Sequence, residues 1–262
     1  MHENSVKIRK ILSLLTPMQV KAQRKIRIGG KTDGGYVMLD DFPKGTIGYS
    51  LGIGNDVSWD CDMADRGVEI FQFDHTVNGP PVEHPRFHFS RIGIGPSDNE
   101  NPQFCRLDTL VRDNNHEAVN LILKMDIEDA EWGVIDSIDT STIAKFNQIV
   151  VEFHGLARLD QPAWQEQIQR SLNKLRCTHL PFHVHGNNWG NYSIVNGIPV
   201  PDVLEVSYAN RSHYTFAQNH AVFPTPLDYP CKTDVPDFYL GTVNVRPHTP
   251  CPPCRYSDDA MS

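Results

Sequence analysis

Basic residues are too few in this chain for a nucleic-acid partner to be expected. Its 262 residues include 24 Lys and Arg against 32 Asp and Glu, which gives a formal net charge of -8. A protein that binds nucleic acid through the phosphate backbone needs a surplus of positive charge. We therefore expect the partner to be a small molecule or a glycan.

Long apolar runs are also missing. No run approaches the roughly 18 residues needed to span a bilayer, and the start, MHENSVKIRKILSLLTP, has no long apolar signal core. We expect no membrane partner and, by default, a cytoplasmic location. A secretory or Golgi-lumen location stays open for a chain whose leader has been removed.

A second Cys-x-x-C motif is absent. Six cysteines lie in a chain that is long enough to bury a core without a disulfide framework. Cys251 and Cys254 form the motif CPPC, but a zinc site needs about four ligands and no partner motif exists. We expect residues 246–262 to form a loose Pro-rich tail, in which the role of the two cysteines stays open.

The chain contains strand-like and helix-like segments that alternate. Near-continuous apolar runs predict an α/β fold whose mostly parallel sheet is buried on both faces by helices. The predicted strands are 46–54, 69–75, 87–95, 120–128, 147–155, 179–188 and 202–211. The predicted helices are 5–15, 57–67, 107–114, 130–138 and 161–174.

A glycine-rich segment, RIGGKTDGGYVML, separates the first helix from the first strand of this sheet. Its two glycine pairs fit hairpin turns and a ligand loop equally well. We predict a cap segment over residues 1–45, one α/β domain over 46–245 and the tail over 246–262.

Polar residues gather where the predicted strands end. In an open parallel sheet, ligands bind at the carboxyl ends of the strands, around the point where the strand order reverses. The polar residues at these ends are Asp56, Asp74, His75, Asp126, Glu128, Glu152, His154, His183, His185, Asn187 and Asn188. We therefore expect the functional site at this edge of the sheet.

The stretch YSLGIGNDVSWD follows the first strand and indicates a nucleotide-type cofactor. Gly52 and Gly54 allow a sharp turn and close approach of a ligand to the backbone. Asp74 follows at the offset of about 20 residues at which an acidic residue accepts hydrogen bonds from ribose hydroxyls. Nicotinamide enzymes and S-adenosylmethionine enzymes share this arrangement.

The third glycine of the dinucleotide pattern is missing, because Val57 stands in its place. Asp56 would also repel a pyrophosphate, whereas S-adenosylmethionine carries a sulfonium and an ammonium group. The loop therefore favours the methyl donor over a nicotinamide cofactor.

Four motifs carry a family resemblance. SLGIGNDVSWDCDMA, FQFDH, LKMDIEDAEWGVI and VVEFHGL, in this order and spacing, resemble the FkbM-type methyltransferases, especially the branch that includes animal methyltransferase-like proteins. The similarity covers roughly residues 25–215. It implies a Rossmann-like class I methyltransferase fold, S-adenosylmethionine as cofactor, and transfer to a hydroxyl, often on a sugar or a polyketide.

The resemblance also implies cofactor-binding roles. Gly52, Gly54, Asn55 and Asp56 would line the methionine end of the cofactor, Asp74 would hold the ribose, and His75 would lie near the adenine. The chain departs from the family once. The family commonly reads D-x-E-G-A-E, and Asp129 replaces the glycine here, which leaves the local turn open to question.

Transfer to a hydroxyl needs a base or a metal ion, because a sugar hydroxyl is a poor nucleophile near neutral pH. The predicted catalytic residues are Asp126, Glu128, His154 and His185. The predicted ligands of a divalent ion such as Mg, Mn or Zn are Asp126, Glu152, His154 and His185. The predicted substrate-binding residues are Tyr36, His183, Asn187, Asn188 and Trp189.

Ordinary structural roles remain open for single members of these sets. A lone buried His is often a hydrogen-bonded core residue, and Glu128 and Glu131 are also the acids that a helix dipole favours in a first turn. We predict a metal-assisted O-methyltransferase that acts on a sugar or glycan. The alternatives are an NAD-dependent oxidoreductase and a non-catalytic binding protein on a methyltransferase scaffold.

Overall fold

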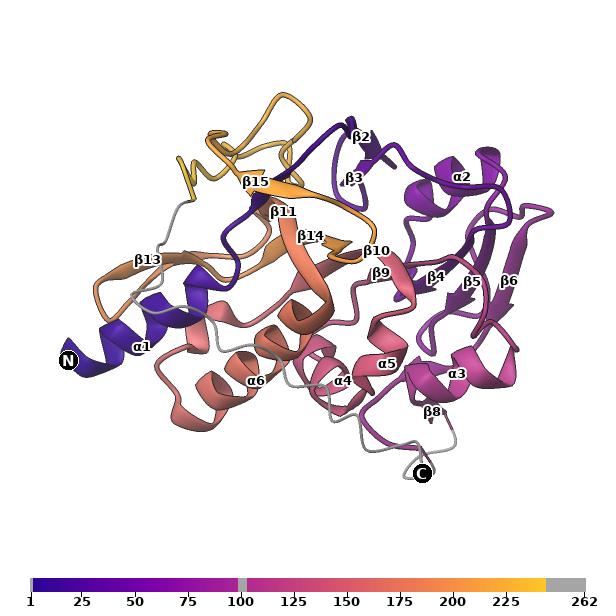
Figure 1. The fold of residues 1–262 in the computed structure, drawn as a ribbon, viewed down its shortest axis with the longest axis horizontal. Coiled ribbons are helices and arrows are strands. Elements are labelled where there is room, and N and C mark those ends of the chain that lie inside the picture. Colours follow the sequence, from indigo (N-terminus) through magenta and orange to yellow (C-terminus); the bar gives the residue numbers. More distant parts are fainter. Residues whose placement is uncertain (1, 99–102, 244–262) are drawn as a thin grey trace.

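A computed structural model describes residues 2–98 and 103–243, and a seven-stranded sheet runs through its centre (Figure 1). The strand order is β11-β14-β10-β9-β4-β5-β6, in which only β14 runs against its neighbours. The strands are β4 (Ile47–Leu51), β5 (Glu69–Phe73), β6 (Phe87–Ser90), β9 (Leu121–Met125), β10 (Phe146–Phe153), β11 (His179–Gly186) and β14 (Leu204–Asn210). The predicted α/β fold with a mostly parallel seven-stranded sheet is confirmed.

Helices cover one face of the sheet and form with it the largest of the three apolar clusters among the described residues. Figure 1 shows them together below the sheet: α1 (His2–Ser13), α3 (Leu107–Asp113), α4 (Glu131–Ser137), α5 (Thr140–Ile143) and α6 (Pro162–Thr178). Trp132 of α4 stacks on Phe153 of β10 with ring centroids 4.1 Å apart. This contact fixes the start of α4 against the end of β10, where polar residues follow.

The other face is covered by one helix and a β-hairpin. Trp59 and Met63 of α2 (Ser58–Asp65) pack with Ile28 and Met38 of the strands β2 (Lys25–Ile28) and β3 (Tyr36–Leu39). The glycine-rich segment is therefore an antiparallel hairpin. The sequence predicts helices on both faces of the sheet, but on this face the hairpin covers part of the area together with α2.

The predicted strand 87–95 is wrong in its second half. Ile92 donates a backbone hydrogen bond to Ser90, and the chain turns away from the sheet after β6. Its continuation, β7 (Gly93–Ile94), pairs outside the sheet with β8 (Phe104–Cys105). The apolar run is therefore split between two different environments.

Short pairs outside the main sheet were not predicted. They are β1 (Met18–Val20) with β15 (Phe216–Gln218), and β12 (Tyr192–Val195) with β13 (Ile198–Pro201). The tail over 246–262, with Cys251 and Cys254, lies outside the described residues. Among the described residues, no helix is both long and apolar enough to cross a membrane.

The turn between β9 and α4 is left-handed although it contains no glycine. Glu128 has φ 53° and Asp129 has φ 76°, a region in which residues with a side chain are strained. Asp129 also forms an ion pair with Arg158. The turn therefore forms without the family's glycine, at a conformational cost.

Replacing Asp129 by glycine should relieve this cost. We expect Asp129→Gly to raise the free energy of unfolding by about 0.5–1 kcal/mol, because a left-handed residue costs about 1–2 kcal/mol and the more flexible unfolded chain takes part of the gain back. Asp129→Asn is the matched control, since it removes the charge but tolerates the same backbone. Denaturant unfolding compares the three proteins, and a glycine variant no more stable than the asparagine variant would contradict the account.

Candidate functional site

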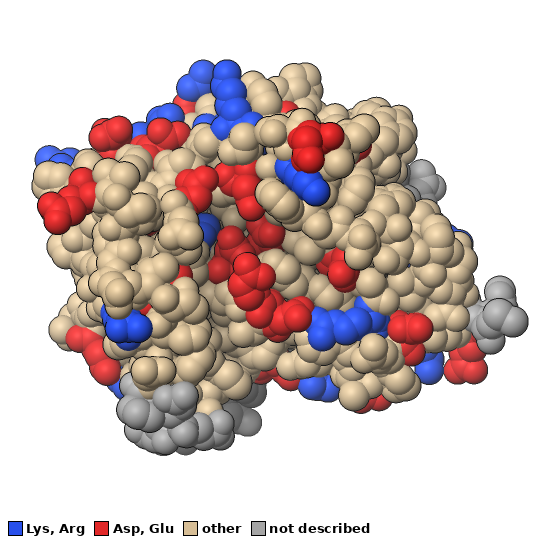
Figure 2. Space-filling model, turned by 180° about the vertical axis from the view of Figure 1, so that it is seen from behind, with Lys and Arg blue, Asp and Glu red and all other residues tan. Residues whose placement is uncertain are grey.

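A cavity of about 290 Å³ opens at the carboxyl ends of β4, β5 and β9. This volume lies at the lower edge of the range of small-molecule sites, about 300–1,000 Å³. Figure 2 shows acidic side chains gathered around a hollow near the centre of one face. The cavity has an apolar end and an acidic end, and each is built by different loops.

The glycine loop after β4 forms one wall of the cavity. Gly52 has φ +76°, and a side chain there would place its Cβ 1.7 Å from the carbonyl oxygen of Asp126. Gly54 has φ +48°, and its Cβ position meets no atom within 4 Å. Gly52 therefore allows two strand ends to touch, whereas Gly54 leaves open space at the cavity wall.

Asp74 fastens this loop. Its Oδ2 accepts hydrogen bonds from the backbone N–H groups of Ile53 at 3.0 Å and Gly54 at 2.9 Å. Its Oδ1 accepts from the backbone and the hydroxyl of Thr76 at 2.7 and 2.6 Å. Burial alone would raise the pKa of Asp74, but these hydrogen bonds outweigh it and lower the pKa. Asp74, which the sequence predicts to hold a ribose, thus also holds the glycine loop, a role that its sequence position does not indicate.

The apolar end of the cavity is aromatic. His75 lies against Phe104 with ring centroids 4.6 Å apart, and Phe73 and Ile94 complete the lining there. A side chain on Gly93 would collide with His75 and Phe104, so the backbone of β7 lies close against these rings. This end suits a flat apolar group such as adenine.

The acidic end receives Asp33 and Gly34 from the loop between β2 and β3. Gly30 in this loop donates a backbone hydrogen bond to the Ser58 hydroxyl at 2.9 Å, so the start of α2 holds the loop in place. The glycine-rich segment is thus both a hairpin and a part of the cavity wall.

Among the described residues that line the cavity, Lys124 is the one Lys or Arg. It donates to the carbonyl oxygen of Gly52 and lies 3.8 Å from Asp126. Asn55 and Asp56, both exposed, line the cavity beside it. Negative charge therefore dominates this end, as the cationic groups of a methyl donor require.

Asp126, Glu152 and His154 form a compact group beside the cavity, with one ligand atom from each within 4.8 Å of the others. The Tyr36 hydroxyl lies 3.4 Å from Asp126 and 3.3 Å from Glu152, so it can donate its one proton to either carboxylate. Asn187 donates to Glu152 at 2.8 Å. Five of the predicted catalytic, metal-binding or substrate-binding residues therefore meet at this point.

Glu131 orients His154. The Nδ1–H of His154 donates to Glu131 at 3.1 Å, and the same carboxylate accepts from the backbone of Ile127 at 2.9 Å. Burial would lower the pKa of His154, but Glu131, Asp126 and Glu128 raise it to about 9. A carboxylate behind the imidazole is the usual arrangement for a metal-ligating His, so Glu131 is more than a first-turn acid.

Buried negative charge is concentrated around Glu152. Burial raises its pKa well above the ordinary value, and Asp126, Glu205 and Asp33 raise it further. The pKa of Tyr36 is raised well above its ordinary value by burial and by Asp126 and Glu152. Carboxylates so close together must share protons or a cation.

His185 does not join this group, which corrects the predicted set of four ligands. Glu205 of β14 pairs in register with Glu152 on one side and with His185 on the other, so one strand separates the two. His185 instead lies with Glu205 and Cys231. Burial would lower the pKa of His185, but Glu205 and Asp237 raise it to about 10.

Two predicted substrate-binding residues have another role. The buried His183 lies 2.7 Å from Asp228, and Asn188 accepts from the backbone of Lys232 and donates to the carbonyl of Val235. Both residues fasten the segment that follows β15. Their polarity in the sequence reflects this docking.

Trp189 lies at the surface with 61% of its area exposed. Its backbone N–H donates to the Asn187 side chain at 2.9 Å, and the ammonium of Lys232 lies 5.1 Å from its ring centre. Asn187 thus contacts both Glu152 and the backbone of the exposed Trp189.

Comparisons with known proteins point to a methyltransferase family. Residues 43–176 match the family described as Methyltransferase FkbM domain. The chain is 26% identical over 117 residues to the human "Probable methyltransferase-like protein 24", which covers 40% of this chain and 32% of that protein. The same protein of Rattus norvegicus is 28% identical over 118 residues, with the same coverage. The match spans about a third of the length of these relatives.

The two glycines of the loop should differ sharply when each is changed to alanine. Both variants carry the strain of a left-handed residue, but only Gly52→Ala also forces a side chain into the Asp126 carbonyl. We expect Gly52→Ala to cost about 1–3 kcal/mol more free energy of unfolding than Gly54→Ala. Equal costs in denaturant unfolding would mean that the close approach of the two strand ends is absent.

Asp74→Ala should lower the free energy of unfolding by about 1–3 kcal/mol at about pH 7, because buried backbone N–H groups lose their acceptor. Since the folded pKa of Asp74 lies below the unfolded value of about 3.9, this stabilisation is complete above that value and is lost as the pH falls through the folded pKa. Unfolding at about pH 7 and about pH 3 measures the gap between wild type and variant. A gap of the same size at both pH values would contradict the assignment.

Proposed function

We propose that this chain, which belongs to the FkbM methyltransferase family, methylates a hydroxyl group of a sugar or glycan with the help of a divalent ion. Family membership makes the chain an S-adenosylmethionine-dependent methyltransferase and sets the nicotinamide alternative aside. The observation that carries the finer proposal is the group of Asp126, Glu152 and His154 beside the cavity, of which Glu152 is buried.

The cavity fits the methyl donor by its chemistry. Its aromatic end, with Phe73 and Phe104, suits the adenine, and its acidic end suits the ammonium and sulfonium groups. Gly54 leaves open space at the wall between them. When bound, S-adenosylmethionine supplies a methyl group on a positively charged sulfur. Asp74 supports this site by holding the loop, and it can reach a ribose hydroxyl only by sharing its oxygens with the protein.

The ion would be held by Asp126, Glu152 and His154. Carboxylate oxygens suit Mg or Mn, and the added imidazole also suits Zn. Glu131 keeps the Nε2 of His154 directed toward the carboxylates, 3.6 Å from Glu152. Such an ion lowers the pKa of an acceptor hydroxyl and offsets the charge that the buried carboxylates carry.

An exposed carboxylate at the rim of the site can accept the proton that methyl transfer releases. The Glu128 side chain is 87% exposed, and its Oε2 lies 3.6 Å from the Nε2 of His154. Because the Nε2 of His154 would ligate the ion, a proton from the acceptor would pass directly to the Glu128 carboxylate, which lines the cavity, and from there to water. This is the role that we propose for the residue.

The acceptor would bind on the side of Asn187 and Trp189. Asn187 donates to both Glu152 and Asp33, so it links the ion-binding group to this surface. The exposed indole of Trp189 offers a flat apolar face of the kind that stacks on a sugar ring. A hydroxyl-rich acceptor would thus reach from the exposed ring to the buried carboxylates.

Chelation and the loss of His154 should have the same effect. We expect EDTA treatment and His154→Ala each to lower methyl transfer from labelled S-adenosylmethionine to a panel of sugars and glycans by at least about 100-fold, the contribution of a positioned acid, base or ion. Calorimetric affinity for S-adenosylhomocysteine should change less than about threefold, because the imidazole lies outside the residues that line the donor cavity.

Exposed His220 provides the control, since His220→Ala should leave both quantities unchanged. Full turnover of the chelated protein would mean that a side chain takes the hydroxyl proton directly. Tight S-adenosylhomocysteine binding without turnover on any acceptor would favour the non-catalytic binding protein instead.

A further inference from the structure

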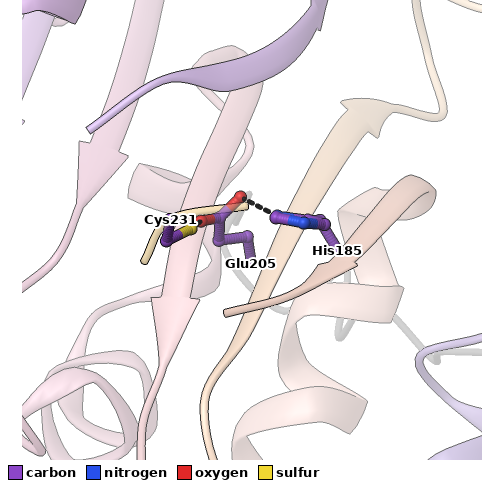
Figure 3. A group of neighbouring side chains, drawn as sticks. All are labelled: His185, Glu205 and Cys231. Carbon is purple, nitrogen blue, oxygen red and sulfur yellow. Dashed lines mark hydrogen bonds and ion pairs between the residues drawn. The ribbon is translucent and has the colours of Figure 1, made fainter. Parts of the chain in front are cut away.

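A second group of possible metal ligands lies across the sheet from His154. Figure 3 shows His185 of β11, Glu205 of β14 and Cys231 of the segment after β15 directed toward one another. All three are buried. The methyl-transfer site described above uses none of them as a ligand, so their convergence calls for its own explanation.

The ligand atoms lie slightly closer together than those of a zinc site. The Nδ1 of His185 lies 3.0 Å from the Oε2 of Glu205, the Sγ of Cys231 lies 3.0 Å from its Oε1, and one atom from each residue lies within 4.8 Å of the others. Two ligands of a tetrahedral zinc ion lie about 3.3–3.8 Å apart, given bonds of about 2.0–2.3 Å. Small side-chain shifts therefore suffice to admit the ion.

Asp237 orients the imidazole as a carboxylate does in known metal sites. The Nε2–H of His185 donates to its two oxygens at 3.0 and 3.1 Å. This contact leaves Nδ1 to face Glu205 and Cys231. A carboxylate behind a ligating His fixes its tautomer and strengthens it as a ligand.

The positive partners of Glu205 and Glu152 are imidazoles, those of His185 and His154. Among the described residues, no Lys or Arg forms an ion pair with Glu205 or Glu152, although one ligand atom of each lies within 4.8 Å of Asp33. Three carboxylates that meet, two of them buried, are costly unless positive charge joins them. A divalent ion bound by Glu205 would replace the proton on the Nδ1 of His185 and add one more positive charge.

We propose that His185, Glu205 and Cys231 form a zinc site separate from the group of Asp126, Glu152 and His154. A thiolate together with an imidazole selects zinc over Mg or Mn, which prefer oxygen ligands. Asp33 and Glu152, which each bring a carboxylate oxygen within 4.8 Å of Glu205, would be the candidates to complete the ligand set of the zinc. This inference goes beyond the proposed function and does not depend on it.

The site would also fasten the segment after β15. Asn188 binds this segment through Lys232, Val235 and Pro236, and Asp237 follows directly. Zinc bound through Cys231 would add a coordinate bond to these hydrogen bonds. The wall of the acceptor side is then held by the metal as well as by packing.

Cobalt substitution tests the site in the full chain. Because Cys251 and Cys254 could also bind metal, we place every variant in a background with Cys251→Ser and Cys254→Ser. We expect Co²⁺ added to the metal-free protein to give a thiolate-to-cobalt charge-transfer band, and zinc analysis to give one equivalent that depends on Cys231. Cys231→Ser should lose both, whereas Cys177→Ser, which removes a thiol on α6, should keep both.

Two further variants separate this site from its neighbours. Asp237→Asn should weaken zinc binding about 10–100-fold, as the loss of a carboxylate behind a ligating His does elsewhere. His154→Ala should leave the cobalt band intact even where it abolishes methyl transfer, so failure of this proposal and failure of the proposed function are distinguishable.

The background protein, in which His185, Glu205 and Cys231 are unchanged, gives the decisive result. This result does not depend on whether a variant of the site folds. A folded background protein that contains no zinc and gives no charge-transfer band with Co²⁺ would overturn the proposal. So would a band that persists in Cys231→Ser. Either result would leave a hydrogen-bonded network in which His185 lies between Glu205 and Asp237.

Discussion

Carboxylates that crowd at one edge of the sheet, with Glu152 and Glu205 buried among them, are the constraint on which the rest of this structure depends. Asp33, Glu152 and Glu205 each bring a ligand atom within 4.8 Å of the others, and Asp126 does so with Glu152 and His154. Lys124, the one Lys or Arg in the cavity wall among the described residues, reaches only Asp126. Like charges at such distances in a low dielectric need protons or cations between them. Four separate chain segments bring these carboxylates together. Because their mutual repulsion must be offset, this arrangement favours a bound cation.

The topology explains why these groups meet. β10 and β11 end at this edge, whereas β14 runs in the opposite direction and begins there. Glu152, Glu205 and His185 therefore stand in one row across three neighbouring strands. The rule that sites lie at the carboxyl ends of strands identified Glu152 and His185 from the sequence. It missed Glu205, because a reversed strand places its first residues at the same edge.

Other parts of the site could not be predicted for a different reason. Asp33 comes from a hairpin loop, and Cys231 comes from a segment without regular structure. Their positions depend on tertiary packing against α2 and against Asn188, which no local pattern encodes. The roles of Asp74 and Asp129 show the same limit, since the sequence identified both positions but not the loop contact or the left-handed turn. The fold itself was predictable, because its apolar runs and turn signals agree locally.

The family match and the site overlap only in part. Residues 43–176 contain the glycine loop, Asp74, Asp126, Glu152 and His154, the parts to which we assign methyl transfer. Asp33, His185, Glu205 and Cys231 lie outside this range, so the matched segment alone does not account for the full carboxylate group. The side of the site to which we assign the acceptor is therefore built largely by residues outside the matched segment.

An anomalous diffraction map from crystals grown with S-adenosylhomocysteine and divalent ions tests the central claim most directly. The account predicts a metal peak among Asp126, Glu152 and His154, and a second peak at His185, Glu205 and Cys231 that shows the zinc edge. It also predicts S-adenosylhomocysteine between the glycine loop and Phe104. Density without anomalous signal at either place, with the carboxylates paired through shared protons, would contradict it.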